Sequence, residues 1–90
     1  MSRVSREVRI TNQRGLHARA SAKFVNLASE IGLQIEVEKD SNKVVGTSIM
    51  GLMMLGAAMG DAIVIHVEGD GADEALARLI ELVEDRFGEE

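Results

Sequence analysis

The sequence has no cysteine, so it can form neither a disulfide nor a thiolate metal site. It has no tryptophan or tyrosine, and its formal net charge is −5. Nucleic-acid binding favours stacking aromatics and a basic surface, so this composition argues against that role. No apolar run approaches the length of a membrane span, and residues 1–6 lack the apolar centre of a signal peptide. These absences predict a cytoplasmic protein that does not insert into a membrane.

A chain of 90 residues is long enough for one domain with its own core, and we expect a single domain over residues 1–90. Its charge is unevenly spread. Residues 1–19 contain five arginines and one acid, whereas residues 61–90 contain ten acids and two arginines. The acidic end is typical of a solvated helix face. No internal repeat, linker or low-complexity tract is visible.

The spacing of apolar residues predicts the order β-α-β-β-α-β-α. Alternation indicates strands over 7–10, 33–38 and 62–68, and a short returning strand over 43–45 follows turn residues at 40–42. Spacings of three and four predict a helix over 18–31, with Gly32 as its C-cap, and a short helix from 48 to about 55. A last helix has an apolar stripe made of Leu76, Leu79, Ile80, Val83 and Phe87.

Strands with one polar face need helices on the other face only. We therefore expect an α/β (α+β) fold. Its form is an open-faced β-sandwich, in which a four-stranded, mostly antiparallel sheet carries three helices on one face.

Residues 15–24 are the best candidate for a reactive site. Gly15 opens a turn there, and His17 lies where a helix is predicted to begin. A neutral imidazole is a nucleophile, and the exposed amides of a helix start bind phosphate. Arg19 adds a planar fork of donors for phosphoryl oxygens. This arrangement favours transfer of a phosphoryl group through His17. The alternative is a surface histidine that only caps a turn.

Two motifs carry a resemblance to a known family. The run Gly15-Leu16-His17-Ala18-Arg19 closely resembles the phosphohistidine motif of HPr, the histidine-containing phosphocarrier family of the bacterial phosphoenolpyruvate-dependent sugar phosphotransferase system. A second family motif, a serine followed by Ile-Met-Gly at the start of the second helix, is present as residues 48–51. The predicted element order also matches the family fold over nearly the whole chain.

The resemblance implies a role for each matching residue. His17 would accept phosphate through Nδ1 from phosphorylated enzyme I and pass it to enzyme IIA domains in sugar uptake. Arg19 would assist, and the backbone amides of Ala18 and Arg19 would bind the phosphate. Ser48 would be a regulatory serine, phosphorylated in some bacteria by HPr kinase. The chain would then perform transferase chemistry only together with partner enzymes, with no cofactor and no metal of its own.

Two positions depart from the family pattern. Ala20 replaces a usual proline, which alters little because both residues suit a first helical turn. Thr47 replaces a lysine that often precedes the regulatory serine, and this bears on recognition of Ser48 by a kinase. Ser48 also has a purely structural explanation, because serine is a good helix N-cap. The two explanations are compatible.

The short helix is too apolar to bury one stripe only, so we expect part of it to form a docking surface of Ile49, Met50, Leu52 and Met53. The alternative is a fully covered core helix. His66 is expected to be a solvated histidine on the polar face of its strand.

The nitrogen-regulatory branch of the same family is an alternative function, because both branches share the histidine motif. A ligand-binding α/β module in which His17 is incidental belongs to a different class. Carriers that serve two partners in turn work naturally as monomers, which is our expectation here.

Overall fold

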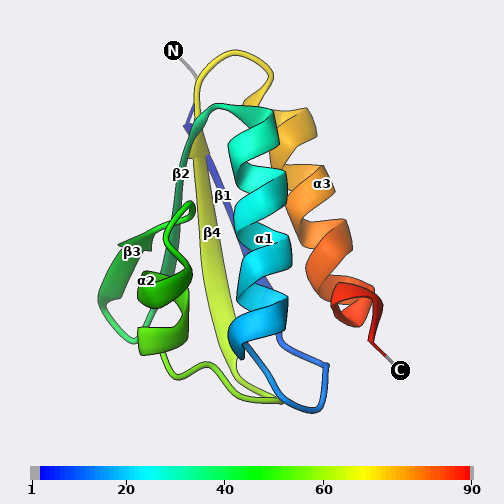
Figure 1. Ribbon diagram of the computed structural model, residues 1–90. Helices are drawn as coiled ribbons and strands as arrows, with labels where there is room; N and C mark the ends of the chain where they lie inside the picture. Colours follow the sequence, from blue (N-terminus) through cyan, green and yellow to red (C-terminus); the bar gives the residue numbers. More distant parts are fainter. Residues whose placement is uncertain (1–2, 90) are drawn as a thin grey trace.

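The computed structural model describes residues 3–89. Its strands are β1 (Arg3–Arg9), β2 (Gln34–Lys39), β3 (Asn42–Val45) and β4 (Ala62–Glu68). Its helices are α1 (Ala18–Ile31), α2 (Ile49–Met54) and α3 (Ala72–Glu84), followed by the 3-10 turn η1 (Arg86–Gly88). The strands form one sheet in the order β1-β4-β2-β3, and every neighbouring pair is antiparallel. The predicted open-faced sandwich is confirmed, with the helices on one face of the sheet (Figure 1).

The core lies between this sheet and the helices. Alternation in β4 turns Ile63, Ile65 and Val67 inward. On α1 the buried positions include Ala20, Phe24 and Ala28, each four residues apart and therefore on one helical face. Because two of these three are alanines, α1 can lie close to the layer beneath it. None of the helices within residues 3–89 is long and apolar enough to cross a membrane.

Most element boundaries fall within one residue of the sequence prediction. The turn between β2 and β3 is tighter than predicted, because Lys39 already pairs with Asn42 and only two residues connect the strands. Asp40 and Ser41 have φ of 51° and 74°, which is the backbone of a two-residue hairpin turn. Asn42 therefore belongs to β3.

The first strand is longer than the sequence predicts. β1 begins at Arg3 and pairs with β4 along its whole length, from Arg3 opposite Glu68 to Arg9 opposite Ala62. The sequence around Arg6 lacks a clear apolar alternation, so only pairing with a distant strand reveals that it is β-structure. Ile10 lies just beyond the strand and is fully buried.

The final helix is shorter than the sequence predicts. α3 ends at Glu84, and Arg86 and Phe87 adopt φ of 57° and 55°, which no α-helix continues. Phe87 is fully buried, as an apolar stripe would require, but its side chain reaches the core from η1. Helical spacing therefore identifies a core residue correctly while assigning it to the wrong element.

Candidate functional site

His17 is the N-cap residue of α1, where the prediction placed it. Its φ and ψ of −76° and −178° are extended, and the backbone N–H of Arg19 donates to its Nδ1 at 3.3 Å. The first amides of a helix have no acceptor within the helix, so those that do not meet the imidazole remain available to a bound anion. The His17 side chain is 21% exposed, which leaves the ring accessible from one side.

The loop before His17 is held by backbone contacts with the segment after α2. The N–H of Leu16 donates to the carbonyl of Ala57 at 3.0 Å. Gly15 has φ of +64°, and a Cβ built on it would lie 2.3 Å from the Ala57 oxygen. Only glycine meets both requirements, a left-handed backbone and this close approach. The loop is therefore fixed in the position that sets the direction of the imidazole.

Glu89 contacts the imidazole of His17, and the sequence analysis did not anticipate this contact. Its Oε2 lies 2.6 Å from Nε2 of His17, although 72 residues separate the two in sequence. Its Oε1 accepts a hydrogen bond from Nδ2 of Asn12 at 3.1 Å, and Asn12 Nδ2 also donates to the carbonyl of Gly15 at 2.8 Å. No local pattern predicts this contact, because it depends on where η1 brings the chain.

These hydrogen bonds define the state of the imidazole. The hydrogen bond from His17 holds the pKa of Glu89 below its ordinary value, against partial burial, which raises it, and with a smaller contribution from Asn12. An ionised carboxylate only accepts, so Nε2 carries the proton in the neutral ring. Nδ1 accepts from the Arg19 amide and therefore bears the lone pair. In the neutral ring Nδ1 is therefore the nitrogen with a free lone pair, and it faces the start of α1.

Arg19 lies two residues beyond His17 and is exposed. Its guanidinium forms no ion pair or side-chain hydrogen bond with any residue from 3 to 89. A guanidinium that no neighbouring side chain holds can rotate to meet the oxygens of a phosphoryl group on Nδ1. Arg14 in the preceding loop is also exposed, so two arginines flank His17 in sequence, and the Glu89 carboxylate lies on the Nε2 side of the ring.

α2 confirms the N-cap prediction for Ser48, whose Oγ accepts from the N–H of Gly51 at 2.9 Å. The predicted docking surface is only partly exposed. Ile49, Met50 and Met53 are 41%, 72% and 44% exposed. Leu52, in contrast, is fully buried and was wrongly included.

The pitch of the helix explains the difference, because Leu52 is the inward-facing residue that anchors α2 to the core. Met54 takes its place as the most exposed apolar residue of this helix, at 79%. We call Ile49, Met50, Met53 and Met54 the α2 patch.

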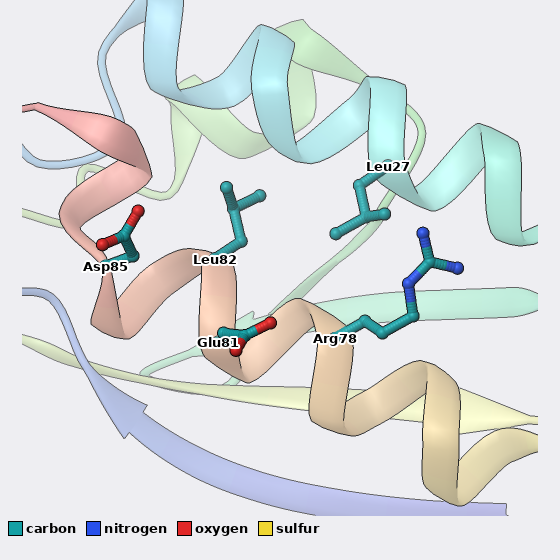
Figure 2. A pocket seen from close by; sticks show the side chains of 5 residues that line it. All are labelled: Leu27, Arg78, Glu81, Leu82 and Asp85. Atoms are coloured by element: carbon teal, nitrogen blue, oxygen red, sulfur yellow. The ribbon is translucent and has the colours of Figure 1, made fainter.

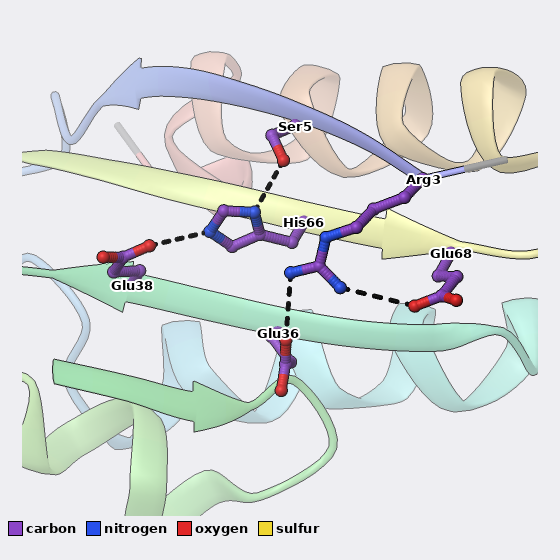
Figure 3. A network of polar contacts seen from close by, with 6 residues as sticks. All are labelled: Arg3, Ser5, Glu36, Glu38, His66 and Glu68. Carbon is purple, nitrogen blue, oxygen red and sulfur yellow. Dashed lines mark hydrogen bonds and ion pairs between the residues drawn. The ribbon is translucent and has the colours of Figure 1, made fainter. Parts of the chain in front are cut away.

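His66 lies on the uncovered face of the sheet but is not freely solvated, which corrects the prediction. Its side chain is 14% exposed, with Nδ1 2.6 Å from Ser5 Oγ and Nε2 2.8 Å from Glu38. Figure 3 shows Arg3 beside it, bridging two further carboxylates on neighbouring strands. Both ring nitrogens of His66 have a partner, so this network ties β1, β4 and β2 together instead of forming a second reactive centre.

A hollow of about 500 Å³ lies between α1 and α3, lined by Leu27 and Leu82 and by three charged residues (Figure 2). Its lining is Leu27, Arg78, Glu81, Leu82 and Asp85. Its polar groups are one guanidinium and two carboxylates, and it does not include His17. Within residues 3–89, no three histidine or carboxylate side chains gather as a metal site would require. Among residues 3–89, the candidate reactive group is therefore the imidazole at the start of α1.

The sequence and the structure both match known proteins along nearly the whole chain. Residues 4–85 match the family described as "PTS HPr component phosphorylation site". The phosphocarrier protein HPr of Pseudomonas aeruginosa is 46% identical over 84 residues, which cover 92% of this chain and 93% of that protein. The phosphocarrier protein NPr of Shewanella violacea is 39% identical, with 99% of this chain and 98% of that protein covered.

The fold matches equally well. The crystal structure of HPr-C-His from Thermoanaerobacter tengcongensis superimposes with a TM-score of 0.88 at 47% sequence identity, covering 100% of this chain and 99% of that one. A family match that includes the His17 motif, relatives of the same length and the same fold agree with one another. The chain belongs to the HPr family of phosphocarrier proteins of the phosphotransferase system.

Proposed function

We propose that Nδ1 of His17 accepts a phosphoryl group from phosphorylated enzyme I and passes it to enzyme IIA domains in the cytoplasm. The proposal rests on the observation that the two ring nitrogens of His17 have different partners. Nε2 is occupied by Glu89 at 2.6 Å, while Nδ1 faces the amides at the start of α1. An electrophilic phosphorus can reach Nδ1 there, and the helix start meets its oxygens.

In the proposed step the lone pair of Nδ1 forms a bond to phosphorus as the donor's bond to phosphorus breaks. The electron pair of that bond returns to the donor. The amides of Ala18 and Arg19 and the guanidinium of Arg19 neutralise the charge on the phosphoryl oxygens. Positioning and charge neutralisation supply most of the catalysis in transfers of this kind, so the carrier needs no cofactor of its own.

The α2 patch is proposed as the apolar part of the surface that both partners contact. It is exposed, it is rich in methionine, and its helix packs against α1, which begins directly after His17 (Figure 1). Methionine side chains adapt to partners of different shape, which suits one surface that serves donor and acceptor in turn. A monomer presents this surface to each partner, and we propose that form for the active carrier.

Ser48 is proposed as a regulatory site for HPr kinase. Its hydroxyl begins the helix that carries the α2 patch, so a phosphate there would place negative charge beside the docking surface. Incubation with the kinase and ATP should add one acid-stable phosphate to the wild type and none to Ser48→Ala. An unmodified wild type, with the kinase active on another carrier, would remove the proposal for Ser48 alone.

The test of the main proposal is transfer from phosphoenolpyruvate through enzyme I, followed by intact mass and acid stability. The wild type should gain one phosphate that acid removes, as expected for phosphohistidine. His17→Asn should gain none, and it keeps an oxygen that can cap α1, so the fold is preserved. His66→Gln serves as the matched histidine control and should be labelled like the wild type.

Absence of label on the folded wild type, with enzyme I active on another carrier, would contradict the proposal and favour a binding module. The sugar branch is proposed, with the nitrogen branch as the alternative, since HPr relatives reach 49% identity where the NPr relative has 39%, although other HPr relatives have 38%. Comparing transfer rates from the enzyme I of each branch distinguishes them, and faster transfer from the nitrogen-branch enzyme would reverse this assignment.

A further inference from the structure

The chain after α3 forms a strap, residues 86–89, that returns to His17. Arg86 and Phe87 both have left-handed backbones, with φ of 57° and 55°, which residues with a side chain rarely adopt. Burial of the Phe87 ring holds this conformation, and Nζ of Lys23 donates to the Phe87 carbonyl at 2.6 Å. A strained segment held from two sides is a well-defined support for the residue that follows it.

That residue is Glu89, and both of its carboxylate oxygens are engaged. Oε2 contacts Nε2 of His17 at 2.6 Å, and Oε1 accepts from Nδ2 of Asn12 at 3.1 Å. Asn12 is 1% exposed and also holds the carbonyl of Gly15, so the carboxylate is tied to the same loop that orients the ring. The contact is therefore built by several elements and is not a chance meeting of two surface side chains.

We infer that Glu89 is a positioning residue for phosphoryl transfer, which holds His17 with Nε2 protonated and Nδ1 aimed at the start of α1. The inference rests on the proposed function and deepens it. The family match ends at residue 85, so Glu89 lies outside the segment that the match covers. Its role is argued from geometry alone.

The carboxylate also affects the charge that develops during transfer. When Nδ1 bonds to phosphorus, the proton stays on Nε2 and the ring becomes cationic. The Glu89 carboxylate lies against that proton and offsets the charge, as the buried aspartate does for the imidazole of serine proteases. In the onward step the bond from Nδ1 to phosphorus breaks, its electron pair returns to Nδ1, and the ring leaves neutral without any proton having moved.

The variant Glu89→Gln tests the inference because it keeps size and removes charge. While Asn12 Nδ2 keeps its hydrogen bond to the Gly15 carbonyl, a glutamine amide between His17 and Asn12 cannot satisfy both neighbours. If its oxygen faces the ring, its NH₂ meets the NH₂ of Asn12. If its NH₂ faces the ring, Nε2 must give up its proton and the lone pair of Nδ1 is lost. Glu84→Gln is the matched control, since it makes the same charge change at an exposed position at the end of α3.

Two measurements are made at pH 8, where an unperturbed imidazole is neutral. The ¹⁵N shifts of the His17 ring report which nitrogen carries the proton, and they need no partner protein. The rate of transfer from phosphorylated enzyme I is separated into kcat and KM. We expect Glu89→Gln to raise the fraction with Nδ1 protonated and to lower kcat about tenfold, with KM unchanged, from loss of one charge-assisted hydrogen bond. Glu84→Gln should match the wild type in both.

A wild-type tautomer in Glu89→Gln would overturn the inference, whether or not the rate changes. A loss seen only in KM would also overturn it, since that outcome assigns Glu89 to docking. If the wild type takes no phosphate at all, the proposed function fails, while the ¹⁵N shifts still decide whether Glu89 sets the tautomer. The two failures are therefore distinguishable.

Discussion

The substitution Gly15→Ala tests how the loop before His17 is held. Two effects should each lower the stability of the folded state, and their costs should add. The left-handed backbone at φ +64° costs about 1–2 kcal/mol once a Cβ is present. The new methyl would also lie 2.3 Å from the Ala57 oxygen and 2.9 Å from Ala58 Cα, both of which belong to backbone that cannot rotate away. Displacing packed atoms of this kind costs about 1–3 kcal/mol.

Gly56 separates the two effects, because it has nearly the same φ of +65° and open space, free of other atoms to 4 Å, where a methyl group would stand. Gly56→Ala should therefore show the backbone cost only. Both alanines reduce the entropy of the unfolded chain to a similar extent, so this gain cancels in the comparison. The difference between the variants, about 1–3 kcal/mol, measures the contact with Ala57.

The assay is reversible unfolding by heat and by urea, followed by circular dichroism. For a domain of this size each 1 kcal/mol lowers Tm by about 4–8 °C, so Gly15→Ala should melt well below Gly56→Ala. It should also slow phosphoryl transfer, since the displaced loop carries His17. Equal melting temperatures for the two variants would refute the argument that close approach to Ala57 is what requires glycine here.

Three further outcomes follow from single contacts. Ser48→Ala should destabilise the fold by about 1 kcal/mol in urea unfolding, because the amide of Gly51 loses its cap; an unchanged midpoint would contradict this role. Phe87→Ala should cost about 3–5 kcal/mol in the same assay, and a loss below about 1 kcal/mol would mean that η1 does not support the core. The carboxyl pKa of Glu89, followed by ¹³C NMR, should lie below its ordinary value of 4.5 and return toward it in His17→Ala. A lowered carboxyl pKa stabilises the folded state at pH values above 4.5, and this stabilisation is lost as the pH falls through the lowered pKa. A titration midpoint of Glu89 at or above 4.5 would contradict the contact with His17.

Local patterns in the sequence are sufficient wherever a structure depends on neighbours along the chain. The helix over 18–31 with Gly32 as its cap, the strand over 62–68 and the cap at Ser48 all agree with the prediction. Each depends on residues within one or two turns, where periodicity and capping act directly. The place of His17 at a helix start belongs to the same class.

Patterns fail where distant parts of the chain decide the outcome. The early residues of β1 are a strand because β4 lies beside them, and Phe87 is buried by a turn that helical spacing does not describe. Exposure of the α2 patch depends on which side of a short helix meets the core, and this removes Leu52 from the predicted surface.

The sequence by itself determined the fold class, the family and the place of His17 at a helix start, because periodicity and a short motif record them locally. Only the tertiary structure decided which nitrogen of His17 faces the helix start. Nε2 of the same ring contacts Glu89, 72 residues away, and Asn12 holds both that carboxylate and the loop before His17. A hydrogen bond between residues so far apart leaves no periodic trace in a sequence, since its geometry exists only once the sheet, α1 and η1 have packed together.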